Sequence, residues 1–279
     1  LSGLEWGVPR WVAEDACEGS YPPKIAVNAT KNTAYLLSWL QGLKQKKGLT
    51  IDSLGVGFNE RSYDKDFIKG MRKALNGAGF ADVKTIAADD CCGGEWNIAK
   101  DMANDAELAA AVDIIGGHHS NKPVPASVLA LKKPMWDTEQ HPGGTNDKWS
   151  TAQLIAQQLN RKYLQYNQTS TITWTAVYSW YDWLFLPGCG IFTANTPWSG
   201  SYNVSASLWS YAHTTQFTEI GWHFGAGGAA GTLSGGGTFV SYVSPDGKDA
   251  SIVIETMGAK TTQQVAVELK QLADTTTTG

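Results

Sequence analysis

The sequence predicts an α/β fold: the C-terminal part of a (β/α)8 TIM barrel, with about six of the eight strands, followed by the start of an antiparallel β-sandwich. Two observations predict this fold. Short apolar runs alternate with amphipathic helical patterns over the first part of the chain, which is typical of parallel strands joined by crossover helices. The pattern then changes to glycine-rich loops around paired β-type runs. We therefore predict a partial barrel over residues 1–220 and a partial sandwich over residues 221–279.

The barrel strands are predicted from short runs of apolar and β-branched residues, as expected for strands buried on both faces. The runs occupy residues 1–6, 54–58, 83–87, 112–115, 134–136 and 171–177. Helices are expected at residues 33–43, 64–77 and 150–166, where apolar residues recur on one helical stripe. Many such units in series favour a (β/α)8 barrel over an open sheet, so about two strands are expected before the first run.

The sandwich strands are predicted at Thr238–Val243 and Ser251–Thr256, two β-type runs joined by the sequence Ser244-Pro-Asp-Gly-Lys248. Pro, Asp and Gly between two such runs favour an antiparallel hairpin. Residues 265–269 are a candidate third strand, and the tail at 275–279 is expected to be disordered. Because two or three strands make a poor free-standing domain, the rest of the sandwich is expected elsewhere.

The composition fits a globular protein with a sizeable core, since 42% of the 279 residues are hydrophobic and 17% are charged. The net charge of -4 and the absence of a dense Lys/Arg block exclude nucleic acid as an expected partner. No apolar run is long enough to predict stable membrane insertion. The 12 Trp residues suit stacking on sugar rings, although large aromatic side chains more often pack in a core.

Cysteines and glycosylation tripeptides bear on the compartment. The four cysteines are Cys17, Cys91, Cys92 and Cys189. Adjacent Cys91 and Cys92 would need separate partners to form disulfides. The sequence allows one disulfide but does not fix which cysteines it joins, and the cysteine spacing is not that of a metal site. Three N-glycosylation tripeptides begin at Asn28, Asn167 and Asn203. They fit a lysosomal or secreted protein, although such tripeptides also arise by chance.

Two of the predicted strands lead into a carboxylate. Asn59-Glu60 follows the run at 54–58, and Glu139 follows the run at 134–136, three strands further on. Because the carboxyl ends of barrel strands meet at one mouth, both side chains are expected to face a common cavity. A lone Glu after a strand is more often a helix cap or a surface ion pair. A pair of carboxyl groups, however, is what cleavage of a glycosidic bond commonly needs.

The chain resembles glycoside hydrolase family 59, a family of clan A. The resemblance rests on five segments: Gly55–Tyr63, Ile114–His118, Thr193–Tyr202, Ala212–Trp222 and Ile252–Met257. It covers the chain up to about Met257. It implies a retaining glycosidase that cleaves terminal β-galactose from galactosylceramide or related β-galactosides by double displacement, through a covalent glycosyl-enzyme.

The resemblance also implies roles for individual residues. Glu60 is the expected acid/base and Glu139 the expected nucleophile. The expected substrate-binding residues are Trp6, Asn59, His118 and Trp174. Either Trp could instead serve packing alone, and Asn59 could satisfy a strand end. The adjacent His118 and His119 could also indicate a metal site, but the sequence has no third ligand at useful spacing. We therefore expect no metal and no other cofactor.

Some residues depart from the family's pattern. His119 replaces a Tyr, and Gln140-His-Pro142 replaces an acidic, aromatic and hydroxyl series, so pocket contacts are expected to differ. Two alternatives stay open: another clan A β-glycosidase acting on glucosylceramide or β-glycan, and a catalytically inactive sugar-binding protein. Because lipid substrates usually need a presenting surface, a lipid-presenting activator protein is a candidate partner.

Overall fold

The structure is a computed structural model. It describes residues 1–13, 27–60, 63–91, 94–141, 148–179, 181, 183, 189–194, 199–225 and 230–268. The chain divides into two compact units. Unit 1 comprises Leu1–Gln140 and Ser170–Ile172, and unit 2 comprises His141–Thr169 and Thr173–Gly279. The division near residue 220 that the sequence predicts stays a prediction.

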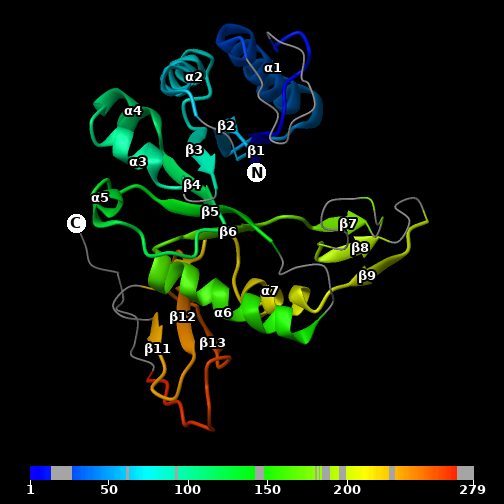
Figure 1. Ribbon diagram of the computed structural model, residues 1–279, viewed down its shortest axis with the longest axis vertical. Coiled ribbons are helices and arrows are strands. Elements are labelled where there is room, and N and C mark those ends of the chain that lie inside the picture. The colour runs from blue at the N-terminus through cyan, green and yellow to red at the C-terminus, as the bar shows by residue number, and fades with distance from the viewer. Residues whose placement is uncertain are drawn as a thin grey trace. The chain divides into compact units, whose positions relative to one another are not determined.

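A parallel sheet dominates unit 1 (Figure 1). Its six strands follow one another in chain order, from β1 to β6. They are β1 (Ser2–Glu5), β2 (Ser53–Phe58), β3 (Lys84–Asp90), β4 (Ile114–His118), β5 (Met135–Gln140) and β6 (Ser170–Thr173). The pairings from β1 to β5 are all parallel. All six predicted barrel strands are therefore confirmed, and strands in sequential order form a curled half-barrel.

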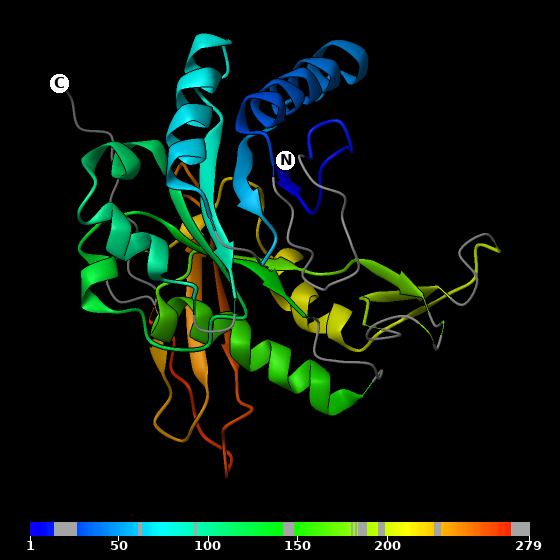
Figure 2. The same ribbon diagram turned by 45° about the horizontal axis from the view of Figure 1, so that its top comes forward.

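Helices cover the outside of this sheet (Figure 2). They are α1 (Ala29–Lys47), α2 (Lys65–Gly77), α3 (Asn97–Met102), α4 (Ala106–Ala111) and α5 (Ala126–Leu129). α1 is longer than the predicted helix at 33–43, because Asn28 caps its start and Gly48, in the left-handed conformation, ends it. In α2 the predicted stripe is confirmed, since Ile68, Met71 and Leu75 are fully buried.

The core of unit 1 lies between these helices and the sheet. Leu54 and Val56 of β2 are buried there, as are Ala87 of β3 and Ile115 of β4. Strands buried on both faces explain why the sequence shows continuous apolar runs rather than alternation.

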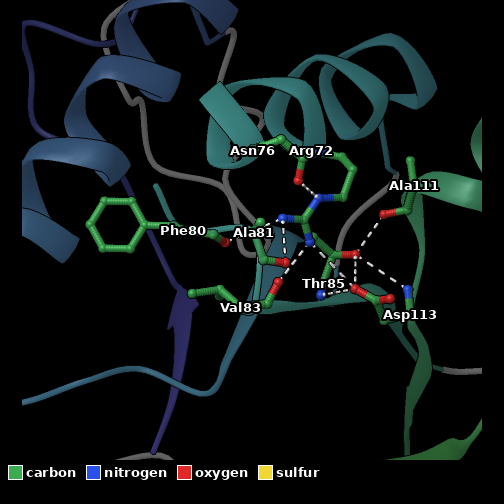
Figure 3. A network of polar contacts seen from close by, with 8 residues as sticks. All are labelled: Arg72, Asn76, Phe80, Ala81, Val83, Thr85, Ala111 and Asp113. Carbon is green, nitrogen blue, oxygen red and sulfur yellow. Dashed lines mark hydrogen bonds and ion pairs between the residues drawn. The ribbon is translucent and has the colours of Figure 1, made fainter. Parts of the chain in front are cut away.

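Arg72 of α2 joins the helix to the amino ends of two strands (Figure 3). Its guanidinium donates to the carbonyl oxygen of Val83 at 2.7 Å, and it lies 3.5 Å from an Asp113 carboxylate oxygen. It also donates to the carbonyl oxygens of Phe80 and Ala81. The same Asp113 oxygen accepts from the backbone N–H of Thr85 at 2.9 Å. The guanidinium group thus supplies hydrogen-bond donors to the carbonyl oxygens of the turn before β3. Through Asp113 it also links this turn to the start of β4.

In its described residues, unit 2 contains two helices and two small sheets. The helices are α6 (Trp149–Tyr166) and α7 (Ser207–Thr215). One sheet holds β10 (His223–Phe224), β11 (Ala230–Thr232), β12 (Thr238–Val243) and β13 (Ala250–Glu255). The other holds β7 (Val177–Ser179), β8 (Phe192–Ala194) and β9 (Tyr202–Val204). The predicted hairpin is confirmed, because β12 and β13 pair antiparallel over their whole length.

One predicted strand of unit 2 is wrong. Residues 265–268, the described part of the candidate third strand, form no strand. The segment just before them is fixed by a side chain instead. Gln263 accepts from the backbone N–H of Gly235 at 2.9 Å and donates to the carbonyl oxygen of Gly236 at 2.7 Å. The third strand comes from Ala230–Thr232, inside the segment expected to be loop. The predicted disordered tail at 275–279 lies outside the described residues.

The predicted run at 171–177 also differs in detail. It contains the whole of β6 except Ser170, a break at residues 174–176, and the first residue of β7. Among the cysteines, Cys91 is disulfide-bonded and Cys189 is free and buried. The other two cysteines lie outside the described residues.

Candidate active site

Four neighbouring strands each place one ionisable side chain at the carboxyl end of the sheet. Glu60 follows β2, and its backbone N–H donates to the carbonyl oxygen of Asp89 at 3.0 Å. Asp89 lies in β3, His118 ends β4 and Glu139 lies in β5. His118 and Glu139 are register partners on adjacent strands. Parallel strands in sequence order therefore bring together residues that are distant in the chain.

His118 lies at the centre of these groups. Its Nδ1 atom is 3.2 Å from Glu60 Oε1 and 3.6 Å from Glu139 Oε2. Its Nε2 atom is 3.2 Å from Asp89 Oδ2. The His118 side chain is fully buried, and those of Asp89 and Glu139 are nearly so. One edge of the ring thus faces both predicted catalytic carboxylates, and the opposite edge faces a buried third one.

The two predicted catalytic carboxylates are close together. One oxygen of Glu60 and one of Glu139 lie within 4.8 Å of each other. Retaining glycosidases hold their carboxyl groups about 5–5.5 Å apart, whereas inverting enzymes need roughly 6.5–9.5 Å to admit a water. The upper bound of 4.8 Å for this pair of oxygens lies below the range of the inverting enzymes.

Acidic neighbours set the charge of His118. Burial alone lowers its pKa, but the ion pair with Asp89 and the charges of Glu139 and Glu60 outweigh burial and raise the pKa to about 9. His118 is therefore an imidazolium in neutral and acidic solution. A buried cation of this kind favours the ionised form of each carboxylate that it faces.

Opposing effects act on Glu139. Burial raises its pKa to about 7, the positive charge of His118 opposes this, and the charges of Glu60, Asp89 and Asp137 add to the rise. In mildly acidic solution and without a bound sugar, Glu139 therefore retains its proton. Attack on a sugar needs an ionised Glu139, and among the groups that act on its pKa His118 is the one that favours this form.

Asn59 lies beside the predicted acid/base residue and is buried. Its backbone N–H donates to the carbonyl oxygen of Glu5 at 3.0 Å. Its side-chain oxygen is buried and has no hydrogen-bond partner among the described residues. A buried polar atom in this state is costly unless a ligand completes it. Asn59 is thus suited to bind a hydroxyl group.

The two predicted tryptophans differ in their placement. Trp6 directly follows β1, at the carboxyl end of the sheet, and 46% of its surface is exposed. Trp174 directly follows β6 but belongs to unit 2, where its ring contacts the rings of His141 and Tyr178. The structure therefore brings Glu60, His118 and Glu139 together, while a pocket wall formed by Trp174 stays a prediction.

Three residues at this site were not predicted as functional from the sequence. Asp89 contacts His118, as described above. The backbone N–H of His119 donates to Asp137 Oδ1 at 3.1 Å and to the carbonyl oxygen of Glu139 at 3.0 Å. His119 Nε2 lies 3.8 Å from Glu139 Oε1. A signal for Asp89 was present, since it follows an apolar run as Glu60 does.

Four of these side chains carry atoms that could hold a metal ion. Glu60, His118, His119 and Glu139 each offer one such atom, and the four atoms lie within 4.8 Å of one another. The sequence predicted no metal because it offered no third ligand at useful spacing. That reasoning considered spacing along the sequence, whereas here the ligands lie on or directly after three different strands.

No helix in the described ranges is both long and apolar enough to cross a bilayer.

Solved structures with a similar fold include a xylanase and SrfJ. A glycoside hydrolase family 30 subfamily 8 xylanase from Clostridium acetobutylicum is similar with a TM-score of 0.62 and 16% identity, over 87% of this chain and 63% of the xylanase. SrfJ from Salmonella typhimurium is similar with a TM-score of 0.68 and 12% identity, over 88% of this chain and 59% of SrfJ. At these identities the likeness shows the barrel fold alone, and it confirms the predicted fold class.

Sequence relatives are more specific. The galactocerebrosidase of Danio rerio is 37% identical over 257 residues, which are 92% of this chain and 36% of that protein. The galactocerebrosidase of Homo sapiens is 36% identical over 261 residues, 93% of this chain and 36% of that protein. The chain thus spans little more than a third of these relatives. The family model described as glycosyl hydrolase family 59 matches residues 1–216, and this chain therefore belongs to that family.

Proposed function

We propose that this protein is a retaining glycoside hydrolase that removes terminal β-galactose from galactosylceramide or related β-galactosides. The observation that carries the proposal is the carboxylate pair: oxygens of Glu60 and Glu139 lie within 4.8 Å of each other, and both side chains contact the buried His118. Family membership and the names of the relatives support the choice of galactolipid.

The proposed reaction has two steps. Glu139 attacks the anomeric carbon while Glu60 donates a proton to the departing oxygen, which leaves galactose bound to Glu139 through an ester. Glu60, now ionised, then takes a proton from a water molecule, and this water attacks the same carbon. The ester breaks, Glu139 is again a carboxylate and Glu60 is again protonated. Galactose leaves with its configuration retained.

His118 and Asn59 support this chemistry without exchanging atoms with the sugar. The His118 imidazolium stabilises the Glu139 anion before attack and after ester cleavage, when that charge reappears. Asn59 directs an unpaired amide oxygen toward a ligand hydroxyl, and such a contact is expected to strengthen in the transition state. The raised pKa of Glu139 in the empty site means that substrate binding must be accompanied by loss of a proton from this carboxyl.

We place the protein in the lysosome or outside the cell. The three glycosylation tripeptides support this location. A lipid-presenting activator protein completes the proposal, because a sphingolipid headgroup must be lifted from its bilayer to reach a barrel mouth.

Covalent trapping tests the proposal. The complete protein is treated with a 2-deoxy-2-fluoro-β-galactosyl fluoride, which forms a slowly hydrolysed ester with the nucleophile of a retaining enzyme. Mass spectrometry should find the label on Glu139, and Glu139→Gln should remove it. Glu60→Gln should slow turnover of aryl β-galactosides by about 10²–10⁴-fold, the usual contribution of an acid/base group.

Other outcomes would contradict the proposal. A label on another carboxylate would overturn the assignment of Glu139. Faster labelling by the 2-fluoroglucosyl reagent than by the galactosyl reagent would favour a different clan A β-glycosidase. Galactose binding that Glu139→Gln leaves unchanged, without any hydrolysis by the unaltered protein, would indicate a sugar-binding protein. Glu107→Gln is the control, because this exposed residue lies on α4.

A further inference from the structure

The site combines two imidazoles and two carboxylates around one point. The four ligand atoms come from Glu60 after β2, from His118 and His119 at the end of β4, and from Glu139 in β5. We propose that, when no sugar is bound, this cluster binds one Zn²⁺ ion or a similar transition-metal dication, and that the ion excludes the substrate. The exclusion of substrate rests on the function proposed above, whereas binding of the ion does not.

The spacing of the ligand atoms fits tetrahedral zinc. Bonds of about 2.0–2.2 Å to nitrogen and oxygen place neighbouring ligand atoms about 3.4 Å apart in a tetrahedron. His118 Nδ1 lies 3.2 Å from Glu60 Oε1 and 3.6 Å from Glu139 Oε2. His119 Nε2 lies 3.8 Å from Glu139 Oε1. The four atoms lie within 4.8 Å of one another, and side-chain rotations would bring them to the separations that an ion requires.

A buried carboxylate stands behind one ligand, as in known metal sites. A histidine that binds a metal through one nitrogen usually has a carboxylate or carbonyl at the other, which fixes the ring and raises its basicity. His118 has this arrangement, with Asp89 Oδ2 3.2 Å from Nε2. Asp137 is fully buried and accepts from the backbone N–H of His119, which holds the turn from which that ring projects.

The ligand types favour certain ions. Two imidazoles with two carboxylates suit Zn²⁺, Cu²⁺ and Ni²⁺, whereas Mg²⁺ and Ca²⁺ prefer sites made of oxygen alone. Charge also favours a dication, because Glu60, Glu139 and Asp89 surround His118 and the ion would replace the proton that Nδ1 of this ring releases on binding. The metal would use the lone pairs that Glu139 needs for attack and would occupy the oxygen of Glu60 that carries the acid proton. The ion is therefore an inhibitor and not a cofactor.

Direct titration tests the binding. Isothermal titration of the complete protein with ZnCl₂ should show one site, and MgCl₂ at the same concentrations should show none. Co²⁺ in place of Zn²⁺ should give the intense visible absorption of four-coordinate cobalt. His119→Gln should raise the Kd for Zn²⁺ at least tenfold. The control His223→Gln, which removes an exposed histidine of unit 2, should leave that Kd unchanged.

The readouts separate this inference from the proposed function. Equal Zn²⁺ affinity in the unaltered protein and in both histidine variants would overturn the metal site. Circular dichroism checks that His119→Gln is folded, and His119→Tyr serves as a second variant with the same expected loss of binding. In assays with an aryl β-galactoside, Zn²⁺ should raise KM and leave kcat unchanged. Zn²⁺ binding that depends on His119 in a protein without turnover would keep the metal site and overturn the enzyme assignment.

Discussion

His118 is fully buried with a carboxylate at each ring nitrogen. A buried imidazolium is stable only when its charge is compensated, and Asp89 supplies that compensation from the side opposite the proposed catalytic pair, Glu60 and Glu139. Asp89 lies beside Nε2 of His118, whereas Glu60 and Glu139 lie beside Nδ1. We therefore regard Asp89 as a positioning residue that acts through His118.

Asp89→Asn tests this role. The charge of Asp89 is among the causes that raise the pKa of His118, so its loss should lower that pKa. His118 would then lose its proton at a lower pH, and the alkaline limb of the kcat/KM profile should move toward acid. We expect kcat to fall on the order of tenfold, since a shift of one pKa unit corresponds to about 1.4 kcal/mol, with little change in KM.

The control for this experiment is Asp82→Asn, which alters an exposed aspartate in the turn before β3. Its pH profile should match that of the unaltered protein. An Asp89→Asn enzyme with lower activity but an unshifted alkaline limb would contradict a role through His118 and would indicate a structural effect only.

The sequence predicted the catalytic pair and His118 but not Asp89, and the reason is local geometry. The apolar run predicts that the strand stops at residue 87, whereas β3 continues to Asp90. Its register with β4 shifts between Ala88 and Asp90, and Asp89 has a φ of 62°. A bulge of this kind re-aims one side chain at the end of a strand. Periodicity cannot show it, because a bulge interrupts the period.

At the scale of elements, α2 depends on contacts at both its ends. Asp64 caps its start by accepting from the backbone N–H groups of Asp66 and Phe67. Arg72 connects its last turns to the strands, as described above. The sequence predicted the helix itself, whereas the acceptors of Arg72 lie in a turn whose path the sequence does not fix.

Arg72→Met should destabilise the protein by on the order of 2 kcal/mol. The carbonyl groups of Phe80, Ala81 and Val83 would each lose a charged donor, and the loss is costliest at the partly buried Val83 carbonyl. The Phe80 carbonyl keeps the backbone N–H of Val83. Urea unfolding measures the change. The control is Lys73→Met, the next residue of the same helix, whose side chain is 73% exposed and pairs with Glu107. It should change stability by less than about 0.5 kcal/mol, and an equal loss in both variants would contradict this account.

The elements of unit 2 show where sequence patterns are weakest. β7, β8 and β9 have three residues each, too few for a period to appear. α6 was predicted within one residue at its start, yet Asn160 on this helix is buried. The Asn160 amide donates to the carbonyl oxygens of Thr238 and Val253, on β12 and β13. A polar residue that binds distant backbone cannot be recognised as buried from its own helix alone.

At the scale of the whole molecule, stability should depend on pH through a carboxyl outside the catalytic pair. Glu5 ends β1 and is buried, with one oxygen accepting from Asn32 at 2.8 Å. Burial raises its pKa to about 7, against the opposing effect of the hydrogen bond. The native state therefore holds this proton up to about pH 7, whereas the unfolded chain releases it near its ordinary value of 4.5.

The sign of the pH dependence of stability follows from this difference in the pKa of Glu5. Below pH 4.5 both states are protonated, and between pH 4.5 and 7 the native state becomes steadily less stable relative to the unfolded chain. Glu5→Gln should therefore stabilise the protein at pH 7.5, by on the order of 2 kcal/mol after allowing for partial solvent screening, and have little effect at pH 4.5. Thermal unfolding of the unaltered protein and of Glu5→Gln across this pH range measures the change in stability. An equal change at both pH values would show that the proton of Glu5 is not responsible.

The path of the chain through the two units has a practical consequence for dissection. The backbone passes from one unit to the other after Gln140, after Thr169 and again after Ile172. A single cleavage at any of these points cannot yield two self-contained halves. A cut after Gln140 leaves the unit 1 residues of β6 with unit 2, and a later cut leaves residues 141–169 of unit 2 with unit 1. Split reporters and domain swaps in this family member should accordingly leave both units in one uninterrupted piece.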